Sequence, residues 1–306
     1  MRQDAIVAKN LVKRYGRGAA LNGFSLSVPV GSTMGLVGRN GAGKTTLMMI
    51  AAGFVLPTSG SIDILGRGAF DAARHGGRLS ILPQDSELPL EARARELLVR
   101  YARLQGLSAA ASEKSADELV EAFNLEAHAG KRIRALSHGM RKRVMVAQAF
   151  IGDPEVVLLD EPLSGLDPVE ASRMRRFIRA RRARQTVVIS SHNLDDIEKL
   201  CTHVAFIEGG KLERVDVLSA FTSASGRIVY ALRRRPGDLP ALERLGEGLT
   251  LAWDGKTGEM TAFFKDEVPP DEVNAKLLPA LLPFGVVSAV SGRSLEEAYL
   301  GIRSGP

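Results

Sequence analysis

The sequence predicts an α/β protein, in which a mixed sheet flanked by helices is interrupted by an all-helical insertion and followed by a small α+β domain. Over the first 210 residues, short apolar runs alternate with helical patterns, as expected for a largely parallel sheet buried on both faces. Between Glu91 and Leu125 the apolar residues recur three and four apart, which is helical spacing. After Ala220 the segment F-T-S-A-S-G is typical of a linker. The predicted parts are a large domain at 1–220 with a helical subdomain at about 85–150, a linker at 221–226 and a small domain at 227–306.

Each element follows from a local pattern. The β-branched and apolar runs of the large domain predict strands at Ala5–Ala8, Phe24–Val28, Thr33–Val37, Ser61–Leu65, Leu79–Leu82, Val156–Asp160, Thr186–Ser190 and Val204–Glu208. In the insertion, the spacing of Leu97, Tyr101 and Leu104 is helical, and so is that of Leu119, Val120 and Phe123. The small domain is expected to run strand, helix, strand, strand, helix, strand, at Ile228–Leu232, Leu239–Leu245, Leu249–Trp253, Thr261–Lys265, Asp271–Leu282 and Val286–Val290. This order is that of the ferredoxin-like unit.

The composition indicates an ordinary globular protein, with 45% hydrophobic and 25% charged residues. The single cysteine, Cys201, excludes an internal disulfide and favours a reducing, cytoplasmic compartment. The N-terminal residues lack the apolar run of a signal peptide. The apolar stretch Leu277–Val287 is too short and too interrupted by proline to span a bilayer. We therefore expect a chain that does not cross a membrane by itself.

The net charge of +6 is unevenly distributed. Residues 221–306 contain 10 Lys and Arg against 11 Asp and Glu, a net of −1, so residues 1–220 contain 31 against 24, a net of +7. Seven arginines fall between Arg173 and Arg184, among apolar residues at helical spacing. A solvated helix face explains them best, with acidic lipid or nucleic acid as the alternative partner. A basic balance alone does not decide between anionic partners.

A phosphate-binding motif follows the third predicted strand. G-R-N-G-A-G-K-T-T, Gly38 to Thr46, fits G-x-x-x-x-G-K-[ST] and precedes a helical run, which is the context that the motif requires. Glycines let successive backbone N–H groups point at phosphate oxygens, and the helix N-terminus adds the positive end of its dipole. Lys44 can reach the β- and γ-phosphates, and Thr45 offers a hydroxyl to Mg²⁺. The motif predicts a P-loop NTPase core that binds through Gly38, Asn40, Gly41, Gly43, Lys44, Thr45 and Thr46.

A second motif, V-V-L-L-D-E-P at Val156 to Pro162, supplies two carboxylates. A buried strand places Asp160 at its carboxyl end, where open α/β sheets bind ligands, and there Asp160 could hold Mg²⁺ directly or through water. Glu161 is placed to polarise a water molecule for in-line attack. Without the phosphate motif, a solvated strand end would explain this pair equally well.

Together with L-S-H-G-M at residues 136–140, these motifs resemble the ATP-binding-cassette (ABC) family of ATPases, over about residues 4–215. In that family an aromatic residue stacks on adenine, a glutamine contacts the metal and the water, and a histidine senses the γ-phosphate. Tyr15, Gln84 and His192 stand at the matching positions. The loop S-G-L-D, Ser164 to Asp167, matches one that touches the partner subunit. Taken singly, each of these residues would be a packed or solvated side chain; their order and spacing favour the functional interpretation.

The stretch L-S-H-G-M resembles the family signature, usually L-S-G-G-Q, which closes on the γ-phosphate of ATP held by the opposite subunit. Ser137 and Gly139 match, whereas His138 and Met140 depart. Backbone must approach phosphate closely at Gly139, where a side chain would intrude. An ordinary helix with Ser137 as its N-cap would give the same local geometry. The resemblance implies that two cassettes, expected to be identical copies, bind ATP and Mg²⁺ head-to-tail and reopen on hydrolysis.

The resemblance also implies a biological role. The family docks a transmembrane permease, a separate chain, on the helical insertion. S-L-E-E-A-Y-L-G-I at residues 294–302 and the S-x-G-M signature are similar to subunits of bacterial efflux systems for drugs, lipids or polysaccharides. We therefore expect an exporter ATPase peripheral to the cytoplasmic face of the membrane, with no nucleic-acid partner. The alternatives are a soluble cassette ATPase acting on DNA or the ribosome, and a regulatory nucleotide-binding module with low turnover.

Overall fold

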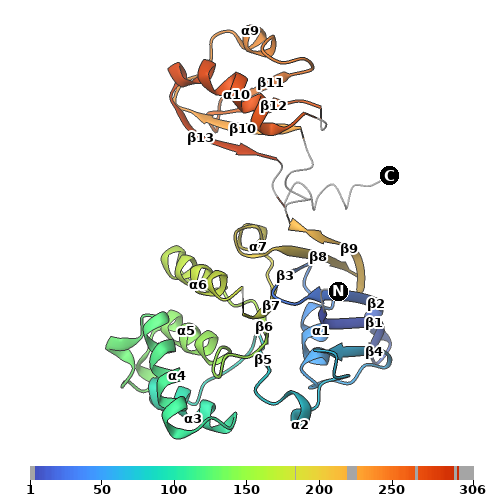
Figure 1. The fold of residues 1–306 in the computed structure, drawn as a ribbon, viewed down its shortest axis with the longest axis vertical. Helices are drawn as coiled ribbons and strands as arrows, with labels where there is room; N and C mark the ends of the chain where they lie inside the picture. Colours follow the sequence, from blue (N-terminus) through green and yellow to red (C-terminus); the bar gives the residue numbers. More distant parts are fainter. Residues whose placement is uncertain (1–3, 183, 219–225, 266–267, 293–294, 296–306) are drawn as a thin grey trace. The chain divides into compact units, whose positions relative to one another are not determined.

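The computed structural model describes residues 4–182, 184–218, 226–265, 268–292 and 295. It divides into two compact units, Met1–Asp216 and Val217–Pro306, and each is described by itself (Figure 1). Of the predicted linker at 221–226 only Gly226 is described, and of the S-L-E-E-A-Y-L-G-I stretch only Leu295. No helix in these ranges is both long enough and apolar enough to cross a membrane.

The first unit is built on a six-stranded sheet. Its strand order is β5-β6-β7-β3-β8-β9, at Leu79–Leu82, Val156–Asp160, Thr186–Ser190, Thr33–Val37, His203–Glu208 and Lys211–Val217. The pairs β5–β6, β6–β7, β7–β3 and β3–β8 are parallel. All residues of β3, β6 and β7 are buried, which explains their continuous apolar runs. Strand β9 was not predicted, because its sequence K-L-E-R-V-D-V is charged and suits an exposed sheet edge.

A separate antiparallel sheet has the order β2-β1-β4, at Gly18–Pro29, Asp4–Tyr15 and Ser59–Ile64. One hydrophobic core joins this sheet to the parallel sheet through helix α1, Lys44–Ala51. Leu26 of β2, Met48 of α1 and Leu158 of β6 are all members of this core. β1 and β2 extend well beyond the predicted strands, because their outer halves are polar and lack an apolar signal.

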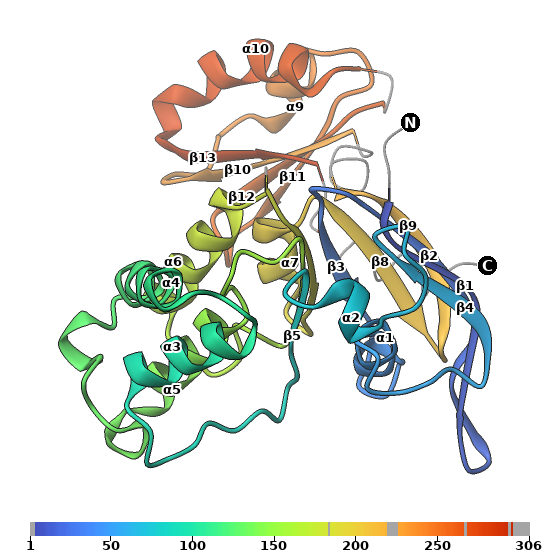
Figure 2. The same ribbon diagram turned by 60° about the horizontal axis from the view of Figure 1, so that its bottom comes forward.

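The helices of the insertion lie on the side of the unit away from this antiparallel sheet, whereas α1 lies beside it (Figures 1 and 2). The insertion contains α3, α4 and α5, at Ala94–Leu104, Ala109–Ala122 and His138–Gln148, with 3₁₀ turns at Glu126–His128 and Ile133–Ala135. Residues 83–155 are all described and contain no named strand. The predicted helical spacing is confirmed, because Leu97, Tyr101 and Leu104 all lie in α3. Leu104 is 77% exposed, and the buried residues of α3 are Ala94, Leu97, Leu98 and Ala102.

The insertion is tied to the rest of the unit by Arg143 of α5. Its buried guanidinium donates to the carbonyl oxygens of Phe123 and Asn124, at 2.9 Å each. The same group lies 3.5 Å from the carboxylate of Glu170 in α6, Pro168–Ala180. One side chain therefore holds the end of α4, helix α5 and helix α6 together.

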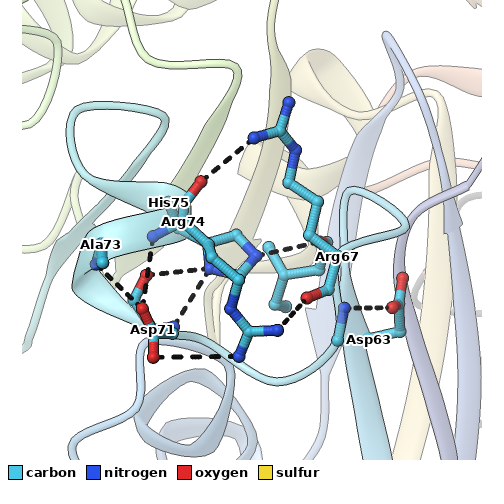
Figure 3. Close-up of polar contacts among 8 residues, drawn as sticks. Asp63, Arg67, Asp71, Ala73, Arg74 and His75 are labelled. Atoms are coloured by element: carbon cyan, nitrogen blue, oxygen red, sulfur yellow. Dashed lines mark hydrogen bonds and ion pairs between the residues drawn. The ribbon is translucent and has the colours of Figure 1, made fainter.

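The connection between β4 and β5 is held by a polar network around the short helix α2, Ala72–His75 (Figure 3). Asp71 caps the helix by accepting from the N–H groups of Ala73 and Arg74, at 2.9 and 3.2 Å. The fully buried His75 receives the Asp71 N–H at 3.0 Å on Nδ1, and its Nε2 lies 3.1 Å from the Ile64 carbonyl oxygen. These contacts fix the path into β5.

The second unit is a four-stranded antiparallel sheet with two helices. In chain order it contains β10, α9, β11, β12, α10 and β13, at Arg227–Leu232, Leu239–Glu243, Thr250–Asp254, Glu259–Phe263, Pro270–Leu281 and Val286–Ser291, with a 3₁₀ turn at Leu282–Phe284 before β13. The sheet order is β11-β12-β10-β13. Alternate residues of β10, namely Ile228, Tyr230 and Leu232, are buried in a core that includes Leu277 and Leu281 of α10. The element order is that of the ferredoxin-like unit.

Candidate nucleotide site

The phosphate motif forms the turn between β3 and α1. Gly43 has φ +109°, and a Cβ there would lie 2.5 Å from the Ala20 carbonyl oxygen. A Cβ on Gly38 would lie 2.3 Å from the Ile207 carbonyl oxygen. Both positions therefore require glycine for reasons within the subunit. No side chain caps the N-terminus of α1, so its first N–H groups remain available to an anion.

Lys44 opens helix α1 and is almost fully buried. Its ammonium donates to the carbonyl oxygens of Gly38 at 2.7 Å and Arg39 at 3.1 Å. Burial lowers the pKa of Lys44, and the negative charges of Glu161 and Asp160 oppose that shift. The cation is thus held at the mouth of the loop, facing the two carboxylates.

The Asp160 carboxylate is held by hydroxyl groups on both of its oxygens. Thr45 Oγ1 donates to Oδ2 at 2.5 Å, and Ser190 Oγ donates to Oδ1. Asp160 and Ser190 are register partners in the parallel strands β6 and β7, which brings the two side chains together at the carboxyl ends of both strands. The orientation of Asp160 is therefore fixed by the P-loop helix on one side and by β7 on the other.

Glu161 has a left-handed backbone with φ +50°, a conformation that costs a non-glycine residue of order 1–3 kcal/mol. Its N–H donates to Ser190 Oγ at 3.0 Å and lies 3.3 Å from the Ser190 carbonyl oxygen. Its buried carboxylate lies 2.9 Å from Nδ1 of His192, whose side chain is 66% exposed. Strained backbone of this kind is common at functional sites, where the surrounding structure holds it in place.

These residues surround one cavity of about 370 Å³. Of the residues expected to bind nucleotide or metal, it is lined by Tyr15, Asn40, Gly41, Gly43, Lys44, Thr45, Thr46, Gln84, Asp160 and Glu161. Gly38 lies beneath the loop, where its carbonyl accepts from Lys44. Tyr15 is 54% exposed at the rim, with the Lys13 ammonium 5.1 Å from its ring centroid. The structure thus brings together residues from positions 15 to 161 of the chain.

Besides Gly38 and His192, three predicted residues are not among those that line the cavity. Ser137 caps α5 by accepting from the Met140 N–H at 3.2 Å. Asp167 caps α6 by accepting from the N–H groups of Val169 and Glu170, at 3.0 and 2.9 Å. Gly139 sits in the first turn of α5. The cavity is therefore formed without these three.

Among the described residues, no neighbour of position 139 requires a glycine there. A Cβ there would meet only the Leu166 side chain, at 3.9 Å, which is ordinary van der Waals contact. Glycine in a helix interior costs about 1 kcal/mol relative to alanine, which sets the upper bound for this first-turn position. Beside it, Nε2 of His138 would lie 3.1 Å from a Cβ on Gly165, so the signature helix touches the S-G-L-D loop.

Two residues at the site were missed from the sequence. Ser190 was predicted only as the last residue of a strand. Its contact with Asp160 depends on the register between β6 and β7. Lys142 of α5 is buried, which lowers its pKa, while the charges of Glu161 and Asp160 oppose the shift. A lysine on the inward face of a helix is the signal that could have revealed it.

The oxygen groups present suit Mg²⁺. Thr45 and Asp160 place a hydroxyl and a carboxylate together, and the Gln84 side chain lies on the same cavity. Among the described residues, no group of three or more His, Cys, Asp and Glu side chains could hold a metal ion. Mg²⁺ is commonly held by one or two protein groups together with phosphate oxygens and water, which fits this sparse donor set.

Comparison with known proteins agrees with this geometry. Residues 21–164 match the family model described as ABC transporter. The chain is 38% identical over 205 residues to the Nod factor export ATP-binding protein I of Burkholderia orbicola (strain AU 1054), covering 66% of this chain and 67% of that protein. It is 34% identical over 213 residues to the protein of the same name from Paraburkholderia xenovorans (strain LB400), covering 69% and 70%.

A solved structure described as the ATP-binding subunit of an ABC transporter has a TM-score of 0.64 and 26% identity, covering 71% of this chain and 91% of that one. The chain combines that fold with an intact P-loop, the paired carboxylates at the end of β6, and sequence similarity over two thirds of its curated relatives. It therefore belongs to the ABC transporter family and is an ATP-binding, ATP-hydrolysing subunit.

Proposed function

We propose that this subunit powers a membrane exporter, whose transmembrane part is a separate chain, by closing head-to-tail on a second identical cassette. The proposal is based on Gly139, the glycine of the signature. Gly38 and Gly43 are required by contacts inside the subunit, whereas Gly139 is not. A glycine that weakens its helix and relieves no internal contact is explained by close approach of a group from outside, here the γ-phosphate on the second copy.

The roles of the site residues follow from their placement. Gly38 to Thr46 and Lys44 would bind the phosphates, Tyr15 would contact adenine, and Ser137 and Gly139 would close on the γ-phosphate of the other copy. Asp167, at the end of the S-G-L-D loop, would lie at the same interface between the two copies.

Thr45, Asp160 and Gln84 would hold Mg²⁺, which neutralises charge on the phosphates when bound. Glu161 would polarise the attacking water, an effect worth about 10²–10⁴-fold where general bases have been tested. His192 contacts the Glu161 carboxylate and would orient it toward that water.

Export is supported by the similar bacterial proteins, which are named Nod factor export ATP-binding proteins. The arginine-rich helix gives little support to a nucleic-acid partner, because several of its arginines are engaged within the unit. Arg175 pairs with Asp196 at 2.5 Å, Arg181 pairs with Asp153 at 2.9 Å, and Arg182 donates to the Leu200 carbonyl. We place the protein on the cytoplasmic face of the membrane, held there by its partner.

Head-to-tail closure is tested with Glu161→Gln. This variant should bind Mg-ATP, lose turnover and accumulate as a dimer in light scattering. Lys44→Ala is the matched control, because it removes the cation at the phosphates and should stay monomeric with ATP. A Glu161→Gln protein that remains monomeric at saturating Mg-ATP would contradict the proposed closure.

The exporter role is tested by co-purification. A tagged chain is solubilised gently from membranes of its own cell, treated with nuclease and washed in moderate salt. Recovery of a multispanning membrane protein supports the proposal. Recovery of ribosomal or DNA-processing proteins without a membrane partner would replace it with a soluble cassette ATPase.

A further inference from the structure

The edge strands of the described sheets differ in how they are protected. An edge strand exposes unpaired N–H and C=O groups, and proteins usually block pairing with charges or covering groups. Edge strand β9 carries Lys211, Glu213, Arg214 and Asp216. At edge strand β11 of the second unit, the N–H of Leu251 donates to the Glu243 carboxylate at 2.7 Å.

Among the described residues, no charge or covering group of this kind protects the opposite edge of that sheet, β13. Its sequence V-V-S-A-V-S contains neither charge nor proline, and five of its six residues are exposed. Val287 and Val290 are 65% and 59% exposed. An uncharged, β-branched and exposed edge of this kind is suited to pairing with another strand.

The backbone register shows which groups of β13 face outward. The Gly292 N–H donates to the Arg227 carbonyl oxygen at 2.7 Å, and Val290 lies opposite Val229 of β10. Backbone groups alternate along an antiparallel pair, so Val290 faces β10 whereas Ala289 and Ser291 present their N–H and C=O groups away from the sheet. Within the described ranges, neither of these two residues has a hydrogen bond on that side.

We propose that β13 pairs antiparallel with β13 of a second copy of this chain, centred on Ala289, so that the two four-stranded sheets become one. The strand is self-complementary under this symmetry. Ala289 meets Ala289 of the second copy, and Ser288 meets Val290 of the second copy, so no charges oppose one another and no large side chains collide.

Two further observations favour a second copy over a foreign strand. Recognition of a foreign peptide by strand addition takes its specificity from side-chain pockets. A cavity of about 220 Å³ in this unit is lined by the Leu245–Leu249 segment, Phe264, Val268 and residues of α10, and not by β13. In addition, residues 221–306 have 10 basic and 11 acidic residues, a net of −1, so two copies of this unit repel each other little.

The pairing is weak by itself. Six residues of strand contact bury far less than the roughly 1,200–2,000 Å² of a stable interface. This inference rests on the proposed function in one respect: the cassette dimer brings two copies together and raises their effective concentration. The second unit then adds a contact that does not depend on nucleotide.

The test is cysteine crosslinking of the full-length chain. The only native cysteine, Cys201, is buried, and burial raises its pKa to about 12, so its thiol reacts poorly. In Ala289→Cys, the paired Cα atoms would be about 5.5 Å apart, within the range of a disulfide. Ala252→Cys is the matched control, since Ala252 is also exposed but lies on the other edge strand, β11.

Nucleotide-free protein at roughly 100 µM is treated with a mild oxidant, a concentration chosen to populate a weak contact. Covalent dimer should form at least about 10-fold faster in Ala289→Cys than in Ala252→Cys. Equal rates in the two variants overturn the proposal.

A second variant separates this inference from the cassette dimer. Ala289→Pro removes an N–H that faces away from the sheet, a position where an edge strand tolerates proline. In a Glu161→Gln background it should keep the ATP-dependent dimer and lose the weak, concentration-dependent dimer seen without nucleotide. A nucleotide-free dimer that persists in Ala289→Pro would equally overturn the pairing, while loss of the ATP-dependent dimer in Glu161→Gln alone concerns the proposed function.

Discussion

Replacing Ser190 by alanine tests how the two carboxylates are positioned. The Ser190 hydroxyl donates to the Asp160 carboxylate and accepts from the Glu161 N–H at 3.0 Å, and its residue is fully buried. Removing a hydrogen bond to a charged group costs about 1.5–3 kcal/mol. The Glu161 N–H would keep only the Ser190 carbonyl oxygen at 3.3 Å while its backbone remains at φ +50°.

If that free energy is lost from alignment in the transition state, kcat should fall about 10- to 100-fold, since 1.4 kcal/mol corresponds to tenfold. ATP affinity measured without metal should change less than about threefold, because the phosphates bind through the loop and Lys44. Ser190→Thr keeps the hydroxyl and should retain more activity than Ser190→Ala, despite an added methyl group in a buried position.

Amide exchange gives a readout that is independent of turnover. In Ser190→Ala, the Glu161 amide should exchange faster than in the wild type, because its shorter hydrogen bond is gone. Ser190 is a positioning residue only if the Ser190→Ala and Ser190→Thr variants differ in turnover. Equal loss in both variants, or turnover of Ser190→Ala within about threefold of wild type, would refute the reasoning.

Three further predictions follow from single contacts. Gly139→Ala should leave the free subunit as stable or more stable by up to about 1 kcal/mol in thermal unfolding, yet abolish the ATP-trapped dimer of Glu161→Gln; an unimpaired dimer would show that nothing approaches this glycine. Gly43→Ala should abolish nucleotide binding in calorimetry, because its Cβ would lie 2.5 Å from a carbonyl oxygen in a left-handed turn, and normal affinity would contradict that geometry. Burial raises the pKa of Tyr230 to about 12, above its usual 10, so the second unit should lose stability as pH rises from about 10 to 12. Tyr230→Phe should show a smaller loss in this window, although it lacks the 2.7 Å hydrogen bond to Asn274, and identical alkaline melts would count against the assignment.

The motifs that were predicted from the sequence are contiguous. The P-loop and the end of β6 each occupy one short stretch, and local geometry follows from the residues themselves. Ser190 could not be assigned in this way, because it meets Asp160 through the register of two strands that are 30 residues apart. The same limit applies to Lys142, whose importance lies in what its helix faces.

The limits of the fold prediction have a similar cause. Periodicity identified α3, but it could not show that the elements packed against α3 end before Leu104. For this reason Leu104 is 77% exposed. Strand β9 was missed because an edge strand in solvent needs neither continuous apolar character nor strict alternation. In both cases, exposure depends on where the neighbouring elements of the unit end, which the local sequence does not show.

The buried Arg143 has a mechanical consequence. Its guanidinium joins the end of α4 to α5 and α6, and removing it would leave two carbonyl oxygens and the Glu170 carboxylate without their cation. A displacement of the insertion should therefore reach α5 and α6 together, the two helices that Ser137 and Asp167 cap. In the proposed cassette dimer, a force on the insertion would thus reach both helix N-termini that are expected to face the second copy.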